Sequence, residues 1–354
     1  MKSTSLVSRR SFIQNSVLGW AAFHSLASLA SQTASGKNPH FQMRGVVLVP
    51  EDFSWPQWPD AAKKANLTTI GIHHQNSPAQ VIEFVQSEKG RKVLEECRRL
   101  SLDVEYELHA MKELLPRDRF ARNSEWFRMD EEGNRNPDSN LCVSSKESLD
   151  IAAENAVKIA AVLRPTTHRY FYWGDDGLPW CRCPQCRGLG DSDQALILEN
   201  RILKALRSVD PGAQLAHLAY ANSLVPPRQV KPEPGIFLEY APINRRYDIP
   251  FETADDKIQK ENLDALDANL EFFGAENAQA LEYWLDVSLF SRWKRPAVKL
   301  PFHPELLQSD LAAYGKRGIR RVTSFAVYID AVYIESFGVP PLEEYGKALS
   351  EWKI

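Results

Sequence analysis

Leu67-Thr-Thr-Ile-Gly-Ile-His-His74 and Leu102-Asp-Val-Glu-Tyr-Glu-Leu-His109 are two segments that we expect to be strands. Each is a mostly apolar run of strand length. Between them, residues 79–100 carry apolar side chains at helical spacing. A strand, a helix and a second strand in this order predict a parallel pair joined by a helical crossover.

The same alternation continues along the chain. We expect strands at residues 45–49, 67–74, 102–109, 169–173, 213–220, 236–241, 280–285 and 321–327, and helices near 59–66, 79–100, 144–163, 192–209, 255–273 and 342–352. Ser144-Ser-Lys-Glu147 is a capping box that opens one of these helices. Eight strands, mostly with helices between them, predict an α/β fold with a single (β/α)8 barrel. An open doubly wound sheet is the alternative, but no glycine-rich phosphate loop follows the first strand.

Composition excludes several classes of protein. The 354 residues are 44% hydrophobic and 25% charged, which is the composition of a folded chain and not of a disordered one. Lys and Arg number 43 against 46 Asp and Glu. Because this balance gives no basic excess to hold a phosphate backbone, we expect no nucleic-acid partner.

The N-terminus has the order of zones that is typical of an export signal. A basic segment precedes a short apolar run, residues 17–30, and small residues follow. Ser8-Arg9-Arg10-Ser11-Phe12-Ile13 matches the twin-arginine pattern. We therefore expect a signal peptide over 1–30, a linker over 31–43, the barrel over 44–354 and a periplasmic or secreted location. The apolar run is too short to span a bilayer comfortably, so no integral membrane segment is expected after its removal.

In a barrel of this kind the active site lies at the C-terminal ends of the strands. Nearly every expected strand of this chain ends in acids, histidines or aromatics. The candidates are Glu51, Asp52, His73, His74, Glu107, His109, Asp175, Asp176, His217, Tyr220, Glu239, Tyr240, Tyr283, Trp284, Asp286, Tyr328 and Asp330.

Tyr172-Trp-Gly-Asp-Asp-Gly177 is the most informative of these strand ends. Two adjacent carboxylates cannot ionise equally easily, so the pKa of one of them is raised. A protonated acid beside a charged partner is what cleavage of a glycosidic bond requires. The pair predicts catalysis by Asp175 and Asp176. A capping or turn role, or ligation of a metal, is the alternative.

A cysteine loop, Trp180-Cys-Arg-Cys-Pro-Gln-Cys186, follows the acidic pair directly. Thiolates at this spacing can converge on Zn²⁺, so Cys181, Cys183 and Cys186 are candidate ligands of a structural zinc ion. The fourth ligand is Cys142, a His or a nearby carboxylate. One disulfide, which an exported location allows, and free thiols are the alternatives. No organic cofactor is expected.

The segment from Tyr170 to Cys186 resembles one bacterial family, domain of unknown function 4838, whose members carry a strand, acids and a Trp-Cys-x-Cys-x-x-Cys loop. The resemblance covers about residues 44–333. It implies an exported barrel protein associated with polysaccharide breakdown, distantly similar to hexosaminidase and α-glucuronidase barrels.

A strand that ends in adjacent acids is also similar to the N-acetylhexosaminidases of glycoside hydrolase families 20 and 84. By this resemblance Asp175 would orient the substrate's 2-acetamido group, and Asp176 would be the general acid and then the base. Tyr220, Tyr283 and Trp284 would form the aromatic wall. These resemblances imply an exported glycoside hydrolase whose carbohydrate substrates contain hexosamine or uronate, with substrate-assisted catalysis.

Two other functions remain open. His73 and His109, together with Glu239 and Asp286, are substrate-binding candidates for a glycosidase, but with His74 and Glu107 they could form the metal cluster of a sugar isomerase or epimerase. A non-catalytic glycan-binding barrel is the other possibility. Arg245 and Arg246 are expected to be a solvated surface pair.

Overall fold

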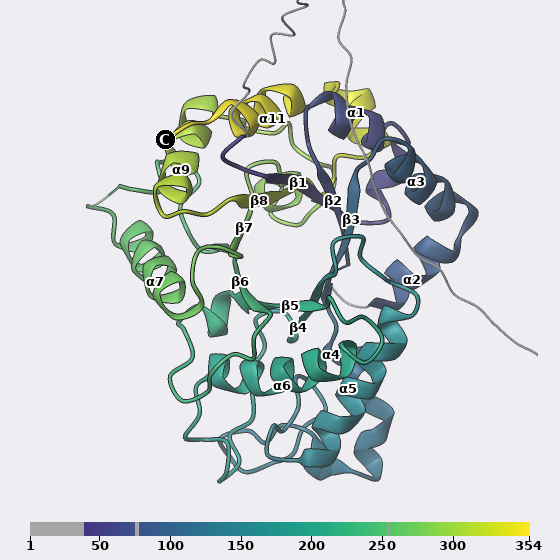
Figure 1. Cartoon of the computed structure of the whole chain (residues 1–354), viewed down its shortest axis with the longest axis vertical. Coiled ribbons are helices and arrows are strands. Elements are labelled where there is room, and N and C mark those ends of the chain that lie inside the picture. Colours follow the sequence, from purple (N-terminus) through teal and green to yellow (C-terminus); the bar gives the residue numbers. More distant parts are fainter. Residues whose placement is uncertain (1–38, 75–77, 254) are drawn as a thin grey trace, which may run out of the picture. The chain divides into compact units, whose positions relative to one another are not determined.

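The computed structural model describes residues 39–74, 78–253 and 255–354, and its eight strands form a closed parallel barrel in sequence order (Figure 1). The strands are β1 Met43–Leu48, β2 Thr69–His74, β3 Asp103–His109, β4 Arg169–Trp173, β5 Gln214–Ala219, β6 Ile236–Tyr240, β7 Gln279–Glu282 and β8 Arg321–Phe325. The barrel closes where β1 pairs with β8, with Gly45 opposite Thr323. The predicted (β/α)8 fold is confirmed.

Helices surround the barrel, as Figure 1 shows. They are α1 Trp58–Lys64, α2 Pro78–Gln86, α3 Glu88–Arg99, α4 Met111–Leu114, α5 Lys146–Ala160, α6 Asp191–Leu206, α7 Lys257–Phe273, α8 Val287–Phe290, α9 Pro304–Lys316, α10 Ala331–Phe337 and α11 Leu342–Glu351. Among the described residues, no helix is long and apolar enough to cross a membrane. The expected signal peptide, residues 1–30, and most of the expected linker lie outside those residues.

Three helical expectations differ from the structure. The single helix expected over 79–100 is two helices, because Ser87 starts a new one: its Oγ accepts a hydrogen bond from Gly90 N at 3.0 Å. The cap of α5 is Ser145 and not Ser144, since Ser145 Oγ accepts from Ser148 N at 3.2 Å. No helix was expected between β7 and β8, where α8 and α9 lie.

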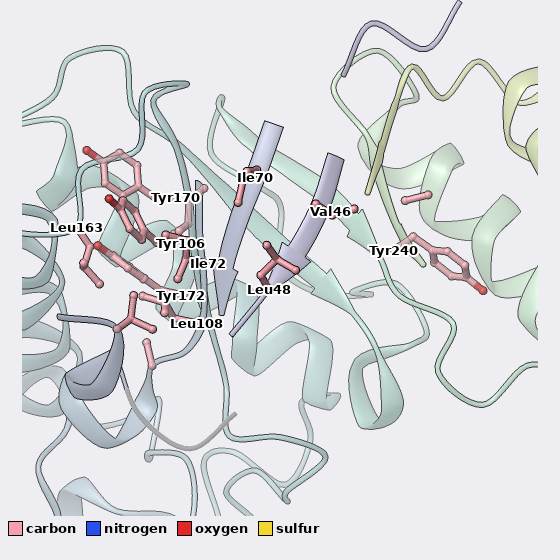
Figure 2. Close-up of a cluster of buried hydrophobic side chains, with 14 of the residues drawn as sticks. Val46, Leu48, Ile70, Ile72, Tyr106, Leu108, Leu163, Tyr170, Tyr172 and Tyr240 are labelled. Atoms are coloured by element: carbon pink, nitrogen blue, oxygen red, sulfur yellow. The ribbon is translucent and has the colours of Figure 1, made fainter. Parts of the chain in front are cut away.

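Each strand contributes side chains to two hydrophobic cores, because successive side chains of a strand point to opposite faces of the sheet. One set faces the surrounding helices and forms the larger cluster, of which Figure 2 shows Val46, Leu48, Ile70, Ile72 and tyrosines of β3 and β4. The other set fills the inside of the barrel, where Val47, Phe171, Phe237 and Phe325 belong to a second cluster. This alternation decides which candidate residues can reach the end of the barrel.

Candidate active site

A cavity of about 650 Å³ lies at the C-terminal ends of the strands. Its lining comes from most of the strand ends and the loops that follow them: Val49, Glu51, His73, His74, His109, Trp173, Asp176, Leu218, Tyr220, Ala221, Ala241, Ile243, Asn244, Leu281, Tyr283, Asp286, Ser288, Trp293, Phe325, Val327 and Tyr328. Three carboxylates and three histidines are among these residues, but no Lys or Arg. A pocket with apolar walls and a few convergent polar groups is the expected form of a small-molecule site.

Asp176 is the acid of the β4 pair that faces the cavity, with its side chain 30% exposed. Tyr220, which follows β5, donates its hydroxyl hydrogen to Asp176 Oδ1 at 2.8 Å. Burial, reinforced by the charge of Asp176, raises the pKa of Tyr220, so this hydroxyl stays protonated and keeps donating. Asp176 is thereby held in one orientation at the cavity wall.

His109, at the end of β3, also lies near Asp176, and its ring is 6.3 Å from that of Tyr220 between centroids. Its Nδ1 is 2.7 Å from the carbonyl oxygen of Gly174, which can only accept, so Nδ1 carries a proton. Its Nε2 is the nitrogen that is turned toward Asp176, 3.9 Å from Oδ1. Because the ring also packs edge-on against Trp173 at 5.0 Å between centroids, its orientation is fixed from two sides.

Asp175 is turned away from the cavity. Its Oδ2 accepts hydrogen bonds from Arg117 at 2.5 Å and from Asn140 N at 2.7 Å, and its side chain is 16% exposed. Asn140 Oδ1 in turn accepts from Asp175 N at 2.9 Å. Asp175 is therefore tied to the β3–α5 loop, and the structure does not bring both carboxylates of the predicted pair to the cavity.

Two glycines make this turn possible. A Cβ at Gly174 would lie 2.9 Å from Asn140 Oδ1 and 3.0 Å from the ring of Trp180, so only glycine fits between them. Gly177 has φ +61°, which is the left-handed region that favours glycine. The turn that presents Asp176 therefore depends on the close approach of Asn140 and Trp180.

His73 forms part of the cavity floor as a neutral imidazole. It is 6% exposed, and burial lowers its pKa to about 3, helped by the proximity of His109. Its Nδ1 donates to the carbonyl oxygen of Glu107 at 2.7 Å. His74 also lines the cavity, and burial lowers its pKa as well. Neutral rings of this kind can exchange hydrogen bonds with sugar hydroxyls without adding a positive charge.

Asp286 is a second acid in the same cavity. It is 4% exposed and caps α8, with Oδ1 accepting from Ser288 Oγ at 2.6 Å and from Ser288 N at 3.0 Å. Burial raises the pKa of Asp286 to about 6, although these hydrogen bonds oppose the shift. Two carboxylates from the ends of different strands, Asp176 after β4 and Asp286 after β7, thus share one cavity.

Two other predicted site residues lie beneath the cavity. Glu239 accepts a hydrogen bond from Trp173 Nε1 at 2.9 Å and is fully buried, so the Trp173 ring separates it from the cavity. Glu107 is also fully buried, and neither of its carboxylate oxygens has a hydrogen-bond partner. Burial, with the proximity of Glu239, raises the pKa of Glu107 well above its ordinary range.

Other candidates point out of the barrel because of strand alternation. Trp284 follows Tyr283 and donates its Nε1 hydrogen to Asp310 of α9 at 2.9 Å. His217 pairs with Glu199 of α6 at 2.7 Å, and Tyr240 donates to Asn262 O at 2.7 Å. Trp284 therefore does not reach the cavity, contrary to the expectation that it forms part of the aromatic wall, whereas Tyr283 and Tyr220 do.

Two candidate acids have structural contacts instead. Asp52 is fully buried and accepts from Val49 N and Tyr328 N, and Asp330 caps α10 and pairs with Arg295 at 2.7 Å. The arginine pair also differs from expectation, because Arg245 is 4% exposed and pairs with Glu282 and Asp310. Only Arg246 is a surface residue.

Sequence reasoning missed two kinds of residue. Trp293, which is 59% exposed at the cavity rim, has no strand beside it that would mark it as a candidate. Arg117 and Asn140 lie in the loop expected to be irregular, and no motif there indicates contact with Asp175. The only available signal was the length of that loop.

A separate cluster of cysteines lies beside the acid turn. Cys142, Cys181, Cys183 and Cys186 are all buried, and their Sγ atoms all lie within 4.8 Å of one another. None of the chain's five cysteines is in a disulfide, and Cys97 is buried on α3. Four convergent thiols can hold a metal ion.

The alternative metal cluster of an isomerase is not brought together. Apart from the cysteines, the described residues contain no group of three or more His, Asp or Glu side chains whose ligand atoms converge closely enough to hold an ion. Glu107 and Glu239 lie below the floor, while His74 and Asp286 belong to the cavity wall.

Residues 25–269 match the family described as "Domain of unknown function (DUF4838)", which confirms the resemblance seen in the cysteine loop. No curated protein matches the sequence.

Solved structures with the same barrel include the beta-galactosidase from Rahnella sp. R3, with TM-score 0.52, 12% identity and coverage of 90% of this chain and 56% of that one. The catalytic mutant of Gan42B, a GH42 beta-galactosidase from G. stearothermophilus, has TM-score 0.52, 12% identity and coverage of 88% and 57%. Exo-beta-1,4-mannosidase Op5Man5 from Opitutaceae bacterium strain TAV5 has TM-score 0.48, 13% identity and coverage of 87% and 60%. The chain thus spans 56% to 60% of the length of these proteins. At such identities the likeness to the two beta-galactosidases shows the fold alone.

Proposed function

The chain belongs to the family described as "Domain of unknown function (DUF4838)", and from the cavity of this member we propose that it is a glycoside hydrolase in which Asp176 is the catalytic acid. One observation carries the proposal: Asp176 and Asp286 line the same cavity from the ends of different strands, in different environments. Two carboxylates with separate roles are the usual requirement of glycosidic hydrolysis.

The proposed reaction uses these two acids in turn. Asp176 gives its proton to the glycosidic oxygen while the bond from that oxygen to the anomeric carbon breaks, and the bonding electrons leave on the oxygen. The Asp286 carboxylate stabilises the positive charge that develops on the sugar. Water then adds to the anomeric carbon and returns a proton to Asp176.

Asp175 has a positioning role in this proposal. Its carboxylate accepts hydrogen bonds from Arg117 and from the backbone N of Asn140, away from the cavity. It therefore fixes the turn that carries Asp176. A substrate-assisted reaction, in which Asp175 would hold the 2-acetamido group, requires Asp175 to leave these partners.

The substrate in this proposal is an uncharged pyranoside, with N-acetylhexosamines among the candidates. The cavity lining contains Glu51, Asp176 and Asp286 but no Lys or Arg. A uronate or a sulfated sugar would bring a negative charge next to these acids without a cation to pair with it. Of the two kinds of glycan expected from the sequence, we therefore favour those that contain hexosamine over those that contain uronate.

We also propose that the protein is exported and that it holds a structural metal ion. The twin-arginine motif supports export, and replacement of Arg9 and Arg10 by lysines would retain the protein in the cytoplasm if the motif is used. The cofactor is a zinc ion at the cysteine cluster with a structural role, because no cysteine lines the cavity. No organic cofactor takes part.

The direct test is hydrolysis of a panel of aryl glycosides: N-acetylglucosaminide, N-acetylgalactosaminide, galactoside, mannoside and glucuronide. Wild type is compared with Asp176→Asn, and Asp264→Asn on the exposed face of α7 is the matched control. Turnover of a neutral glycoside that is lost only in Asp176→Asn supports the proposal. Binding of glycans without turnover of any glycoside or oligosaccharide would contradict it and favour a glycan-binding barrel.

A further inference from the structure

We infer that Cys142, Cys181, Cys183 and Cys186 form a tetrahedral zinc site that clamps two loops together and so holds the turn carrying Asp176. The site itself does not depend on the proposed glycosidase activity. Only its effect on the position of Asp176 rests on that function.

The sulfur geometry fits one zinc ion. Cys142 Sγ is 3.7 Å from Cys183 Sγ and 3.9 Å from Cys186 Sγ, and all four sulfurs lie within 4.8 Å of one another. A tetrahedral ion with Zn–S bonds of about 2.3 Å separates its sulfurs by about 3.8 Å. Four cysteine ligands that leave no coordination position for water or substrate are typical of a structural zinc site.

The surroundings of the sulfurs favour thiolates. Cys181 Sγ accepts hydrogen bonds from Met129 N at 3.3 Å and from Cys183 N at 3.4 Å. Arg135 places a guanidinium nitrogen 3.8 Å from the same sulfur. Backbone donors and one cation around a buried sulfur cluster offset the negative charge of metal-bound thiolates.

The four ligands come from two loops that are distant in sequence. Cys142 lies in the loop that precedes α5, and the other three follow the acid turn after β4. Backbone bonds already run between these loops, since Arg182 N donates to Met129 O at 2.8 Å. A bound ion would add four strong links at the same place.

The clamp reaches the acid turn through Asn140, two residues before Cys142. Asn140 bonds both the backbone N and the carboxylate of Asp175, and its Nδ2 donates to Leu178 O and Pro179 O, each at 3.0 Å. Asp176 thus lies in a segment that Asn140 holds at Asp175 and that the ion would hold at Cys181. Loss of the ion would release Cys142 and Cys181, and would so loosen both the loop that carries Asn140 and the segment that carries Asp176.

The first experiment measures metal in protein purified without chelator, and about one equivalent of zinc is expected. Cys142→Ser should lose most of the zinc, whereas Cys97→Ser, a buried cysteine outside the cluster, should keep it. Co²⁺ exchanged into the protein should give the absorption of a tetrahedral thiolate site. Zinc below about 0.2 equivalents, or a disulfide between any two of the four cysteines, would overturn the site without any assay of hydrolysis.

The second experiment separates the clamp from catalysis. Exchange of zinc for Co²⁺ should leave kcat within about twofold, because the ion touches no substrate. Asn140→Asp, which keeps its shape but loses the Nδ2 donors, should keep full zinc and the circular-dichroism spectrum while kcat falls at least tenfold. Unchanged kcat in Asn140→Asp would overturn the link to Asp176. Failure of the wild type to hydrolyse any glycoside would instead contradict the proposed function and leave the metal result standing.

Discussion

Tyr220 donates a hydrogen bond to Asp176 across 2.8 Å and links the end of β5 to the turn after β4. Both residues line the cavity, and His109 Nε2 lies 3.9 Å from the same carboxylate oxygen. The carboxylate is therefore oriented by neighbouring strands of the barrel and not by its own turn alone. Orientation of this kind is what a general acid needs to meet the glycosidic oxygen.

Tyr220→Phe should reduce kcat about tenfold, because it removes one hydrogen bond of ordinary strength and leaves the ring in place. The fold should be unaffected, since the hydroxyl has one polar partner among the described contacts. Steady-state kinetics on the aryl glycoside identified by the panel would measure the effect. An unchanged kcat would show that this bond does not orient the acid.

Asp175→Asn and Arg117→Ala distinguish two roles for Asp175. If Asp175 acts by positioning, both variants break the same ion pair and should cause similar losses of kcat on every substrate. If Asp175 holds a 2-acetamido group, only Asp175→Asn should fail, by about 100-fold or more, and only on N-acetylhexosaminides. Arg119→Ala, an exposed neighbour, is the control for Arg117. We expect the first result.

Asp286 should make the stability of the protein depend on pH. Burial raises its pKa to about 6 in the folded state, above the ordinary value of an unfolded Asp. The stabilisation is complete below about pH 4 and is lost as pH rises through about 6. Asp286→Asn keeps the cap but cannot ionise. The free energy of unfolding of wild type should therefore fall by about 2 kcal/mol relative to Asp286→Asn between pH 4 and pH 7.

Urea unfolding of both proteins at the two pH values measures this difference directly, because other titrating groups cancel between them. A wild-type curve parallel to that of the variant would show that Asp286 ionises as an exposed acid does. In the same variant, loss of kcat without loss of binding would support its role at the anomeric carbon.

Tyr283 and Trp284 are neighbours with opposite predicted effects. Trp284→Phe leaves the buried Asp310 without one donor and should lower the free energy of unfolding by about 1–3 kcal/mol, with KM unchanged. Tyr283→Ala removes part of the cavity wall and should raise KM. Thermal unfolding and kinetics of the two variants test the assignment. A higher KM in Trp284→Phe would contradict the outward orientation of this ring.

The sequence predicted the strands well because each strand is an apolar run of the right length between polar segments. All eight lie within two residues of their expected starts, as β4 at Arg169–Trp173 illustrates. The helix break at Ser87 was missed, since the apolar spacing continues across it and only the cap reveals the second helix.

It was harder to predict which side chains point into the cavity and which point away from it. At β7 the expected strand includes both Tyr283 and Trp284, and only the register of the barrel decides which one points inward. The same holds for Asp175 and Asp176, where contacts with Arg117 and Asn140 turn one acid away. Those partners are 58 and 35 residues away in sequence, so no local pattern indicates them.

If Asp176 protonates the leaving group, the loss of activity in Asp176→Asn must depend on how much that group needs a proton. Aryl glycosides of the sugar found in the panel would be compared with good and poor leaving groups. We expect a loss of kcat of about 100-fold or more for poor leaving groups and a much smaller loss for good ones, which need no proton. An equal loss for both kinds of leaving group would contradict the assignment of Asp176 as the acid.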